Sequence, residues 1–436
     1  MSDPALTALA RPGTVLLDSA RPDADTGSRG ALLFERPVRE IAARTLAEVG
    51  PALDALDAAL AEGLHVAGML AYEAGAALVP GLTPTATDPS VPLLWFGVYG
   101  APEVLTADRL DAALGTLARG AGPRPVRDLT FALGREAYRD RIARAKTHIQ
   151  AGDVYQVNLT APLRFRTEGS GAALYAALRQ RQAVPYGALL NLPGPDPAGG
   201  PTVLSLSPEL FVRVDPGDGG RTVTARPMKG TAPRGATPEA DDGLVAGLLA
   251  AEKDRAENLM IVDLLRNDLA RVARGGSVRV PRLFEAERYA TLTQMTSTVT
   301  ADLREGVGLA DVLRAAFPCG SVTGAPKRRA VEVLRTLEDG PRGAYCGAIG
   351  YAAPGPEGLR SAVFNVAIRT AVLAAGGGGS RASRVRVHPA DLSREGRYSV
   401  GSGVVWDSEA DAEYDECLLK ARVLSDLADA PVRLAG

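Results

Sequence analysis

Lysine is rare in this 436-residue sequence, and one lysine stands in a segment suited to covalent chemistry. Only five of the 49 basic residues are lysines. Lys229 lies in segment 226–231, which reads Arg-Pro-Met-Lys-Gly-Thr. Arginine stays protonated, whereas a desolvated lysine amine can lose its proton and attack an electrophilic carbon. Lys229 is therefore the first candidate for a covalent nucleophile.

Two pairs of carboxylates have the spacing of a metal site built on helices. Asp254 and Glu257 lie three residues apart, as do Glu413 and Glu416. On a helix this spacing puts both side chains on one face. If the two helices converge, they offer only oxygen ligands, which suit Mg²⁺. The alternative is a solvated helix surface, with Lys420 in a helical salt bridge.

A further carboxylate, Glu209, has apolar neighbours in segment 205–211, Ser-Leu-Ser-Pro-Glu-Leu-Phe. Apolar surroundings raise the pKa of a carboxyl group, so that it can donate a proton at neutral pH. The alternative is an exposed turn glutamate after Ser-Pro.

The elements that must position these residues follow from periodicity and turn residues. We expect helices at 38–49, 52–60, 135–150, 239–272 and 411–427. We expect strands at 14–17, 93–98, 154–163, 343–352, 360–374 and 384–388, the last after a hairpin connection at 376–379. Strand blocks mixed with long helices, without regular βαβ alternation, predict an α+β fold, and the Pro/Gly turns favour antiparallel sheets. The linker at 120–125 divides the chain into regions 1–125 and 126–436.

Composition excludes several classes of protein. The net charge of −2 comes without a basic stripe, so no nucleic-acid partner is expected. We find neither a signal peptide nor an apolar run long enough to span a bilayer, so no membrane partner is expected. The three cysteines, Cys319, Cys346 and Cys417, have no paired spacing. This argues against a disulfide framework or zinc site and fits a reducing cytoplasm.

Six segments in order resemble the chorismate-utilising enzymes, which include anthranilate synthase component I, aminodeoxychorismate synthase component I, isochorismate synthase and salicylate synthase. The segments are 152–159, 207–209, 226–231, 257–264, 320–327 and 401–403. The resemblance covers nearly the whole chain. It implies a Mg²⁺-dependent enzyme acting on chorismate. It also implies an α+β fold in which two large antiparallel sheets pack face to face with helices outside, a four-layer α/β/β/α arrangement.

The resemblance also implies roles for individual residues. Glu257 and Glu416 correspond to metal ligands, with Asp254 and Glu413 as nearby carboxylates acting through water. Glu209 corresponds to the acid that serves the leaving hydroxyl. The residues that resemble the cradle for the substrate carboxylates are Gly230, Thr231, Thr323, Tyr345, Arg369, Gly401, Ser402, Gly403 and Lys420.

Two positions distinguish branches of the family. Salicylate and isochorismate synthases have a lysine at the position of Gln156, and a neutral amide cannot replace it as a base. Anthranilate synthases have alanine at the position of Lys229, whereas aminodeoxychorismate synthases typically have lysine. The resemblance therefore implies amination of chorismate through a covalent lysine intermediate, in 4-aminobenzoate and folate biosynthesis. Anthranilate synthesis and a non-catalytic chorismate- or tryptophan-binding regulator remain alternatives.

The ammonia for such a reaction must come from elsewhere, because none of the three cysteines stands in the strand-to-helix turn of a glutaminase nucleophile. We expect a separate glutamine amidotransferase subunit.

A second binding site is implied near the N-terminus, where segment 16–19 resembles a tryptophan-pocket motif of relatives. The residues implied for this pocket are Leu17, Asp18, Ser19, Pro185, Tyr186 and Gly187. L-tryptophan there could be a feedback inhibitor or a structural ligand, and an empty pocket is the alternative. The chain departs from the family at Gln294, where many members have histidine, and we assign no catalytic role to His65, His148 or His388.

Overall fold

The computed structural model describes residues 7–22, 27, 29–82, 86–122, 124–194, 199–217, 219–289, 292–375 and 393–435. The strand expected at 384–388 and the hairpin connection at 376–379 lie outside the described residues, as does His388. None of the described helices combines the length and apolar composition needed to cross a membrane.

The described strands form two large sheets, and all pairings except that of β21 with β7 are antiparallel. The 11-stranded sheet has the order β21 (Arg433–Leu434), β7 (Val126–Phe131), β8 (Gln156–Thr167), β20 (Arg394–Val404), β19 (Thr370–Leu373), β10 (Thr202–Ser207), β9 (Tyr186–Asn191), β1 (Thr14–Ser19), β2 (Gly30–Phe34) and β6 (Glu103–Leu105), with β16 (Gly324–Ala325) paired to β8. The 10-stranded sheet has the order β13 (Met228–Pro233), β15 (Leu292–Asp302), β12 (Gly220–Arg226), β11 (Leu210–Gly217), β18 (Gly358–Val366), β17 (Ala348–Gly355), β4 (His65–Leu70), β5 (Leu94–Tyr99) and β3 (Arg39–Ala43), with β14 (Arg279–Arg288) paired to β15.

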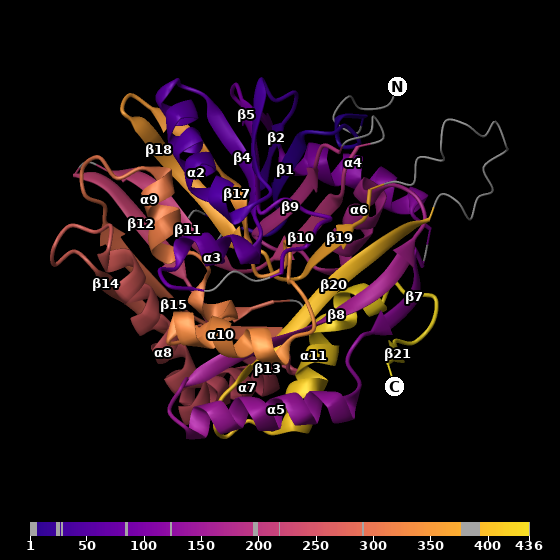
Figure 1. Ribbon diagram of the computed structural model, residues 1–436. Helices are drawn as coiled ribbons and strands as arrows, with labels where there is room; N and C mark the ends of the chain where they lie inside the picture. Colours follow the sequence, from indigo (N-terminus) through magenta and orange to yellow (C-terminus); the bar gives the residue numbers. More distant parts are fainter. Residues whose placement is uncertain are drawn as a thin grey trace.

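Helices cover the outer faces of both sheets (Figure 1). The longer ones are α2 (Leu46–Ala61), α4 (Ala107–Gly120), α5 (Arg135–Gln150), α6 (Gly171–Arg181), α7 (Pro238–Ala250), α8 (Glu252–Ala270), α9 (Leu309–Ala316), α10 (Lys327–Leu337) and α11 (Ala410–Ser425); the short ones are α3 (Gly75–Leu78), η1 (Tyr72–Ala74) and η2 (Gly320–Val322). One buried apolar layer joins α2, α8 and α9 to the 10-stranded sheet, and another joins α4, α5, α6, α10 and α11 to the 11-stranded sheet.

A third apolar layer lies between the two sheets. It contains Val15 and Phe34 from one sheet and Met69, Trp95 and Ile349 from the other, all buried. Apolar side chains on the inner faces of both sheets remove each other from water, which drives sheet-on-sheet packing. The expected fold of two antiparallel sheets packed face to face, with helices outside, is therefore confirmed.

The two regions separated by the predicted linker share both sheets. Strands β1, β2 and β6 lie in the 11-stranded sheet, and β3, β4 and β5 lie in the 10-stranded sheet. The boundary near residue 125 stays a prediction, and it does not separate the sheets from each other.

Two helix predictions were wrong in detail. Residues 39–43 form β3 instead of part of a helix at 38–49, and α2 then runs through Pro51 without the expected break. The helix begins at Leu46 because Thr45 and Glu48 form a reciprocal capping box. The long helix expected at 239–272 is two helices, because Ala251 adopts an extended conformation between α7 and α8.

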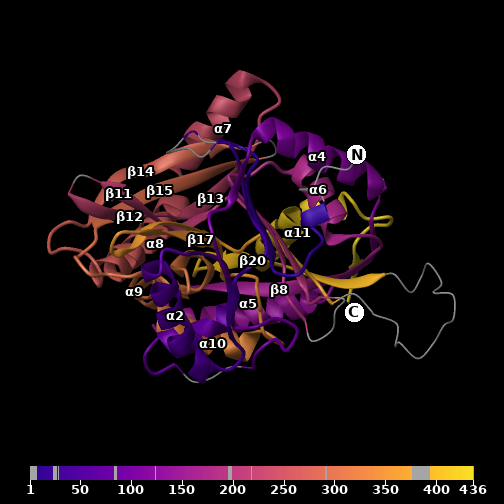
Figure 2. The ribbon, with the colours of Figure 1, turned by 90° about the horizontal axis from the view of Figure 1, so that it is seen from above.

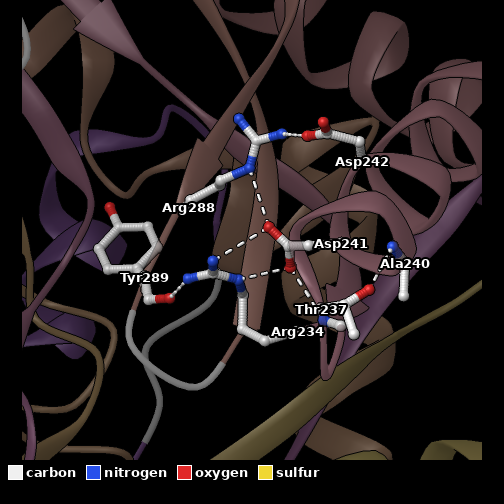
Figure 3. Close-up of polar contacts among 8 residues, drawn as sticks. Arg234, Thr237, Ala240, Asp241, Asp242, Arg288 and Tyr289 are labelled. Carbon is white, nitrogen blue, oxygen red and sulfur yellow. Dashed lines mark hydrogen bonds and ion pairs between the residues drawn. The ribbon is translucent and has the colours of Figure 1, made fainter.

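An ionic cluster fixes the start of α7, which projects from the molecule in Figure 2. The Asp241 carboxylate accepts hydrogen bonds from Arg234, Arg288 and the Gly235 backbone N–H. Arg234 also donates to the Tyr289 carbonyl oxygen (Figure 3). The cluster therefore joins the end of β13 to β14 and α7.

Candidate active site

Three side chains from different elements converge on Gly403 in β20. A Cβ atom at Gly403 would stand 2.6 Å from Lys229 Nζ, 2.7 Å from Gln156 Nε2 and 3.5 Å from Glu257 Oε2. Lys229 comes from β13, Gln156 from β8 and Glu257 from α8. Any larger residue would fill the space that these groups share, so only glycine leaves it open.

Lys229 lies at the edge of the 10-stranded sheet beside α8. Asn258 Nδ2 of α8 lies 3.4 Å from the Lys229 carbonyl oxygen and donates to it. Gly230 has a φ of 94°, a conformation that suits glycine, and a Cβ there would stand 3.1 Å from Asp254 Cβ. This close approach brings the lysine-bearing strand against the predicted metal-ligand face of α8.

Glu209 is buried, and its carboxyl group has a defined partner. Ser321 Oγ donates to Glu209 Oε1 at 2.6 Å. Burial raises the pKa of Glu209 to about 7, although this hydrogen bond and the charges of Lys229 and Lys420 oppose the rise. A protonated carboxyl therefore persists near neutral pH within the field of both lysines.

The four predicted metal-site carboxylates lie on α8 and α11 and influence one another. Burial raises the pKa of Glu257, and the negative charges of Glu413 and Asp254 raise it further. Burial also raises the pKa of Asp254, with Glu416 adding to the effect. Burial would raise the pKa of Glu416 too, but the charge and hydrogen bond of Lys420, 2.6 Å away, outweigh it and lower that pKa.

This donor set fits a hard divalent cation that is completed by other ligands. Glu413 Oε1 accepts from Ser408 at 2.8 Å, whereas its buried Oε2 has no hydrogen-bond partner among the described residues. Within the described residues, no three His, Cys, Asp or Glu side chains are placed to hold an ion by themselves. Mg²⁺ commonly takes one or two protein carboxylates and fills its shell with water and an anionic substrate. The mutual repulsion of the carboxylates would be relieved by such an ion.

The predicted substrate cradle contains one strong candidate for anion binding. Arg369 is buried with a φ of 51°, and its Nη1 has no hydrogen-bond partner in the described part of the protein. Burial lowers its pKa, while the charge of Glu209 opposes this. An unpaired, buried guanidinium group is costly, so it suits a site where a carboxylate binds.

Several other cradle residues already use their side chains within the protein. Ser402 Oγ lies 2.8 Å from Tyr138 Oη, and Thr323 Oγ1 donates to the Cys319 carbonyl oxygen. Lys420 Nζ donates to the Gly401 carbonyl oxygen at 2.8 Å.

The two remaining cradle side chains differ in exposure. Thr231 is exposed on β13, opposite Gln294 in β15. Tyr345 is buried, and burial raises its pKa well above the usual value.

Sequence reasoning missed the partner of Glu209. Ser321 lies in segment 320–327, which the family resemblance singled out, but its role was not assigned. The only signal was its place within that segment. A hydroxyl donor 112 residues from its acceptor cannot be paired from sequence spacing.

The six residues predicted for a tryptophan pocket line one cavity between the two sheets. Its volume is about 370 Å³, and its lining also includes Arg213, Asp215, Ile349, Tyr351 and Asn365. The Asp18 carboxylate itself points to α6, because it accepts from Tyr175 Oη at 3.0 Å and pairs with Arg179. Polar recognition in the cavity therefore depends on other groups.

Known proteins are similar to this chain in sequence and fold. The profile of a family described as chorismate binding enzyme matches residues 16–426. An aminodeoxychorismate synthase of Streptomyces griseus is 43% identical over 296 residues, which is 68% of this chain and 36% of that protein. Anthranilate synthase component 1 of Streptomyces coelicolor is 41% identical over 287 residues, 66% of this chain and 50% of that protein. The matched part is thus about a third to a half of these relatives.

Solved structures give the same result for the fold. Anthranilate synthase component I of Streptococcus pneumoniae superposes with a TM-score of 0.69 at 25% identity, covering 91% of this chain and 92% of the other. The menaquinone-specific isochorismate synthase of Escherichia coli gives a TM-score of 0.67 at 17% identity, covering 98% and 92%. The second likeness concerns the fold alone.

Proposed function

Because the chain belongs to the family of chorismate-binding enzymes, we propose that it converts chorismate and ammonia to 4-amino-4-deoxychorismate. This is the reaction of aminodeoxychorismate synthase component I, in the route to 4-aminobenzoate and folate. The observation that carries the proposal is the position of the Lys229 amine. It shares the open space at Gly403 with Gln156 and Glu257, and it lies near enough to Glu209 for its protonated form to affect that carboxyl group.

In the first proposed step, the neutral Lys229 amine attacks C2 of the chorismate ring. Both ring double bonds shift, and the C4 hydroxyl leaves as water with the proton of Glu209. That proton is available because burial raises the pKa of Glu209 to about 7. The nitrogen now bonded to C2 carries a positive charge.

In the second step, ammonia attacks C4 and the double bonds shift back. The C2–N bond breaks, and Lys229 leaves as a neutral amine. The new C4 ammonium group returns one proton to the Glu209 carboxylate. The sum is chorismate and ammonia to aminodeoxychorismate and water, and the covalent intermediate divides one difficult substitution into two easier ones.

Glu257 and Glu416 are the residues proposed to hold Mg²⁺, with Asp254 and Glu413 acting through water. The metal would supply positive charge against a substrate carboxylate. Arg369 is proposed to bind a substrate carboxylate, since its Nη1 has no partner within the protein.

The main rival is anthranilate synthesis, which sequence identity alone does not exclude. Relatives of both names match at nearly equal identity, 43% and 41%. The difference rests on Lys229, because anthranilate formation needs no covalent nucleophile there.

Intact-protein mass spectrometry tests the proposal. The chain is incubated with chorismate and Mg²⁺ but without ammonia, and the expected result is an adduct with the mass of chorismate less water. Lys229→Ala removes the adduct, whereas Lys146→Ala retains it. With ammonium chloride added, anthranilate formation at equal rates by the parent and by Lys229→Ala would overturn the proposal.

The ammonia is proposed to come from a separate glutamine amidotransferase subunit.

L-tryptophan is proposed as the ligand of the 370 Å³ cavity, as an inhibitor or as a structural component. The cytoplasmic location stays a prediction.

A further inference from the structure

Gln156 has a buried side-chain amide that the proposed mechanism leaves without a role. The residue is fully buried, and neither its Oε1 nor its Nε2 has a hydrogen-bond partner among the residues that the structure describes. A buried amide without partners destabilises the folded state, so native proteins rarely retain one unless it serves a ligand or a reaction.

The backbone holds this amide in place. Gln156 begins β8, where it pairs with Ala325 of β16. Gly324 approaches so closely that a Cβ there would stand 2.2 Å from the Gln156 carbonyl oxygen. The next residue, Val157, pairs with Val404 of β20. With neighbouring strands on both sides, the start of β8 cannot shift, and only the side chain can turn.

The amide nitrogen of Gln156 and the amine of Lys229 lie near the same point. Gln156 Nε2 and Lys229 Nζ both lie within 2.7 Å of the position that a Cβ of Gly403 would occupy. A half-turn of the amide about its last side-chain bond exchanges nitrogen and oxygen, and Oε1 then faces the lysine. Within the described part of the chain, Gln182 and Gln294 also have a buried amide oxygen without a partner, but neither is among the atoms that meet at Gly403 with Lys229.

We propose that Gln156 is a positioning residue for Lys229: its amide oxygen accepts one N–H of the neutral amine and so directs the nitrogen lone pair toward the substrate ring. The inference rests on the proposed amination. An amide stays neutral near pH 7 and is a very weak base, so Gln156 orients the nucleophile without taking up its proton. Either an N–H or the lone pair of the amine can point toward the ring. The acceptor holds one N–H away from the ring.

The first test measures the reactivity of Lys229 without substrate. The full chain is labelled briefly with acetic anhydride, and peptide mass spectrometry gives the labelling rate of Lys229 relative to Lys146, Lys253 and Lys327. In Gln156→Met, which keeps the length and removes the acceptor, we expect this ratio to fall about tenfold. An unchanged ratio in the folded variant overturns the inference, whether or not the amination proposal holds.

The second test separates positioning from substrate binding. Quenched-flow mass spectrometry measures the rate of adduct formation from chorismate and Mg²⁺, and calorimetry measures chorismate affinity. Gln156→Met is expected to slow adduct formation about tenfold or more while affinity stays within about threefold. An affinity loss that accounts for the whole change in rate would show that Gln156 binds substrate instead, and would overturn the inference.

Two further variants serve as controls. Thr167 lies at the other end of β8, is buried and has an unpartnered Oγ1, so Thr167→Val removes a similar group far from Lys229 and is expected to leave both rates unchanged. Gln156→Asn keeps an amide but shortens its reach, and is expected to change both rates in the same direction as Gln156→Met. It also replaces Gln156→Met if that variant does not fold.

Discussion

In the proposed reaction, the Lys229 amine and the Glu209 carboxyl must each be neutral, whereas exposed lysine and glutamate side chains are charged near neutral pH. The lysine has to be neutral to attack, and the glutamate has to be protonated to assist the leaving hydroxyl. Burial of Glu209 provides the second condition, even though Lys229 and Lys420 both favour its ionised form. The proton donor and the nucleophile therefore influence each other. Transfer of a proton from Glu209 to Lys229 would leave a carboxylate that cannot donate and an ammonium that cannot attack.

Glu209 gives a pH prediction for activity. Because its pKa is about 7, the protonated acid is lost as pH rises, so the rate of adduct formation by enzyme whose Lys229 amine is already neutral should decline above pH 7. Glu209→Gln should reduce this rate by on the order of 100-fold and remove the decline with pH. Quenched-flow mass spectrometry between pH 5.5 and 9 measures both effects. A decline of the same shape in Glu209→Gln would contradict the assignment.

The same group gives a prediction for stability. A carboxyl whose pKa is raised from 4.5 to about 7 on folding contributes stability that is complete below pH 4.5 and is lost as pH rises through 7. Glu209→Gln should therefore show a smaller fall in melting temperature between pH 5 and pH 8 than the parent does. Calorimetry at the two pH values checks this.

The motifs identified several residues that the fold brings together. Lys229, Gln156 and Glu257 come from three separate segments and meet at Gly403. The use of each side chain was less predictable. Asp18 resembles a pocket residue, yet its carboxylate is committed to Arg179, because a long-range ion pair leaves no signature in local sequence.

At the scale of elements, the site depends on β20 passing close to β8, β13 and α8. Gly403 is the point of contact, and the atoms that a Cβ would meet are the ends of flexible side chains. Those ends can move aside, so a side chain at this position should displace the catalytic groups without unfolding the protein.

Gly403→Ala is therefore expected to fold normally and to slow adduct formation by on the order of 100-fold, since small displacements of reacting groups have large kinetic effects. Circular dichroism checks the fold and mass spectrometry checks the rate. The matched control is Gly247→Ala in α7, where a Cβ meets nothing within 4 Å. Normal adduct formation in Gly403→Ala would show that Lys229 does not act in this space.

The Asp241 cluster fixes the element that follows the lysine-bearing strand (Figure 3). The hydrogen bond of Arg234, followed by that of the Gly235 N–H, lowers the pKa of Asp241 well below its usual value. A carboxylate with a lowered pKa contributes stability above its unfolded pKa and loses it as pH falls.

Asp241→Asn should accordingly lower the melting temperature at pH 7, and the difference from the parent should shrink as pH falls below 4. Asp242→Asn is the control, because among the described residues Asp242 pairs with Arg288 alone, and should have a smaller effect. Equal melting temperatures of parent and Asp241→Asn at pH 7 would exclude a structural role for the cluster.

Element types were predictable from sequence where side chains alternate or recur with a clear period, and less so at breaks. The interruption between α7 and α8 occurs at Ala251, a good helix former. Its extended conformation depends on how the two helices pack, and the helix propensity of a residue carries no information about such packing. Residues 39–43 pair with β5 to form β3, and this long-range pairing overrode a helical pattern.

The whole molecule is one assembly of two sheets in which both predicted regions take part. Strands from the first 105 residues extend each sheet, and the 370 Å³ cavity lies between them. The α+β class followed from the mixture of strands and helices, but strand order did not, because most pairs join segments far apart in sequence. The family resemblance supplied the packing of two antiparallel sheets face to face, and strand order came only from the structure.

The three cysteines bear on where the ammonia for the proposed reaction comes from. A glutaminase needs a thiolate nucleophile. Cys319, Cys346 and Cys417 are all buried, and burial raises each thiol pKa to about 12. Burial thus disfavours the thiolate form of all three cysteines, which supports the proposal that the ammonia comes from a separate subunit.

We therefore expect product from chorismate and Mg²⁺ with a high concentration of ammonium chloride, and none with glutamine alone. Liquid chromatography with mass detection of aminodeoxychorismate measures both. Iodoacetamide treatment should leave the ammonium-dependent rate unchanged, because the thiols are buried and protonated. Turnover with glutamine that iodoacetamide abolishes would place a glutaminase nucleophile in this chain, and a separate amidotransferase subunit would then be unnecessary.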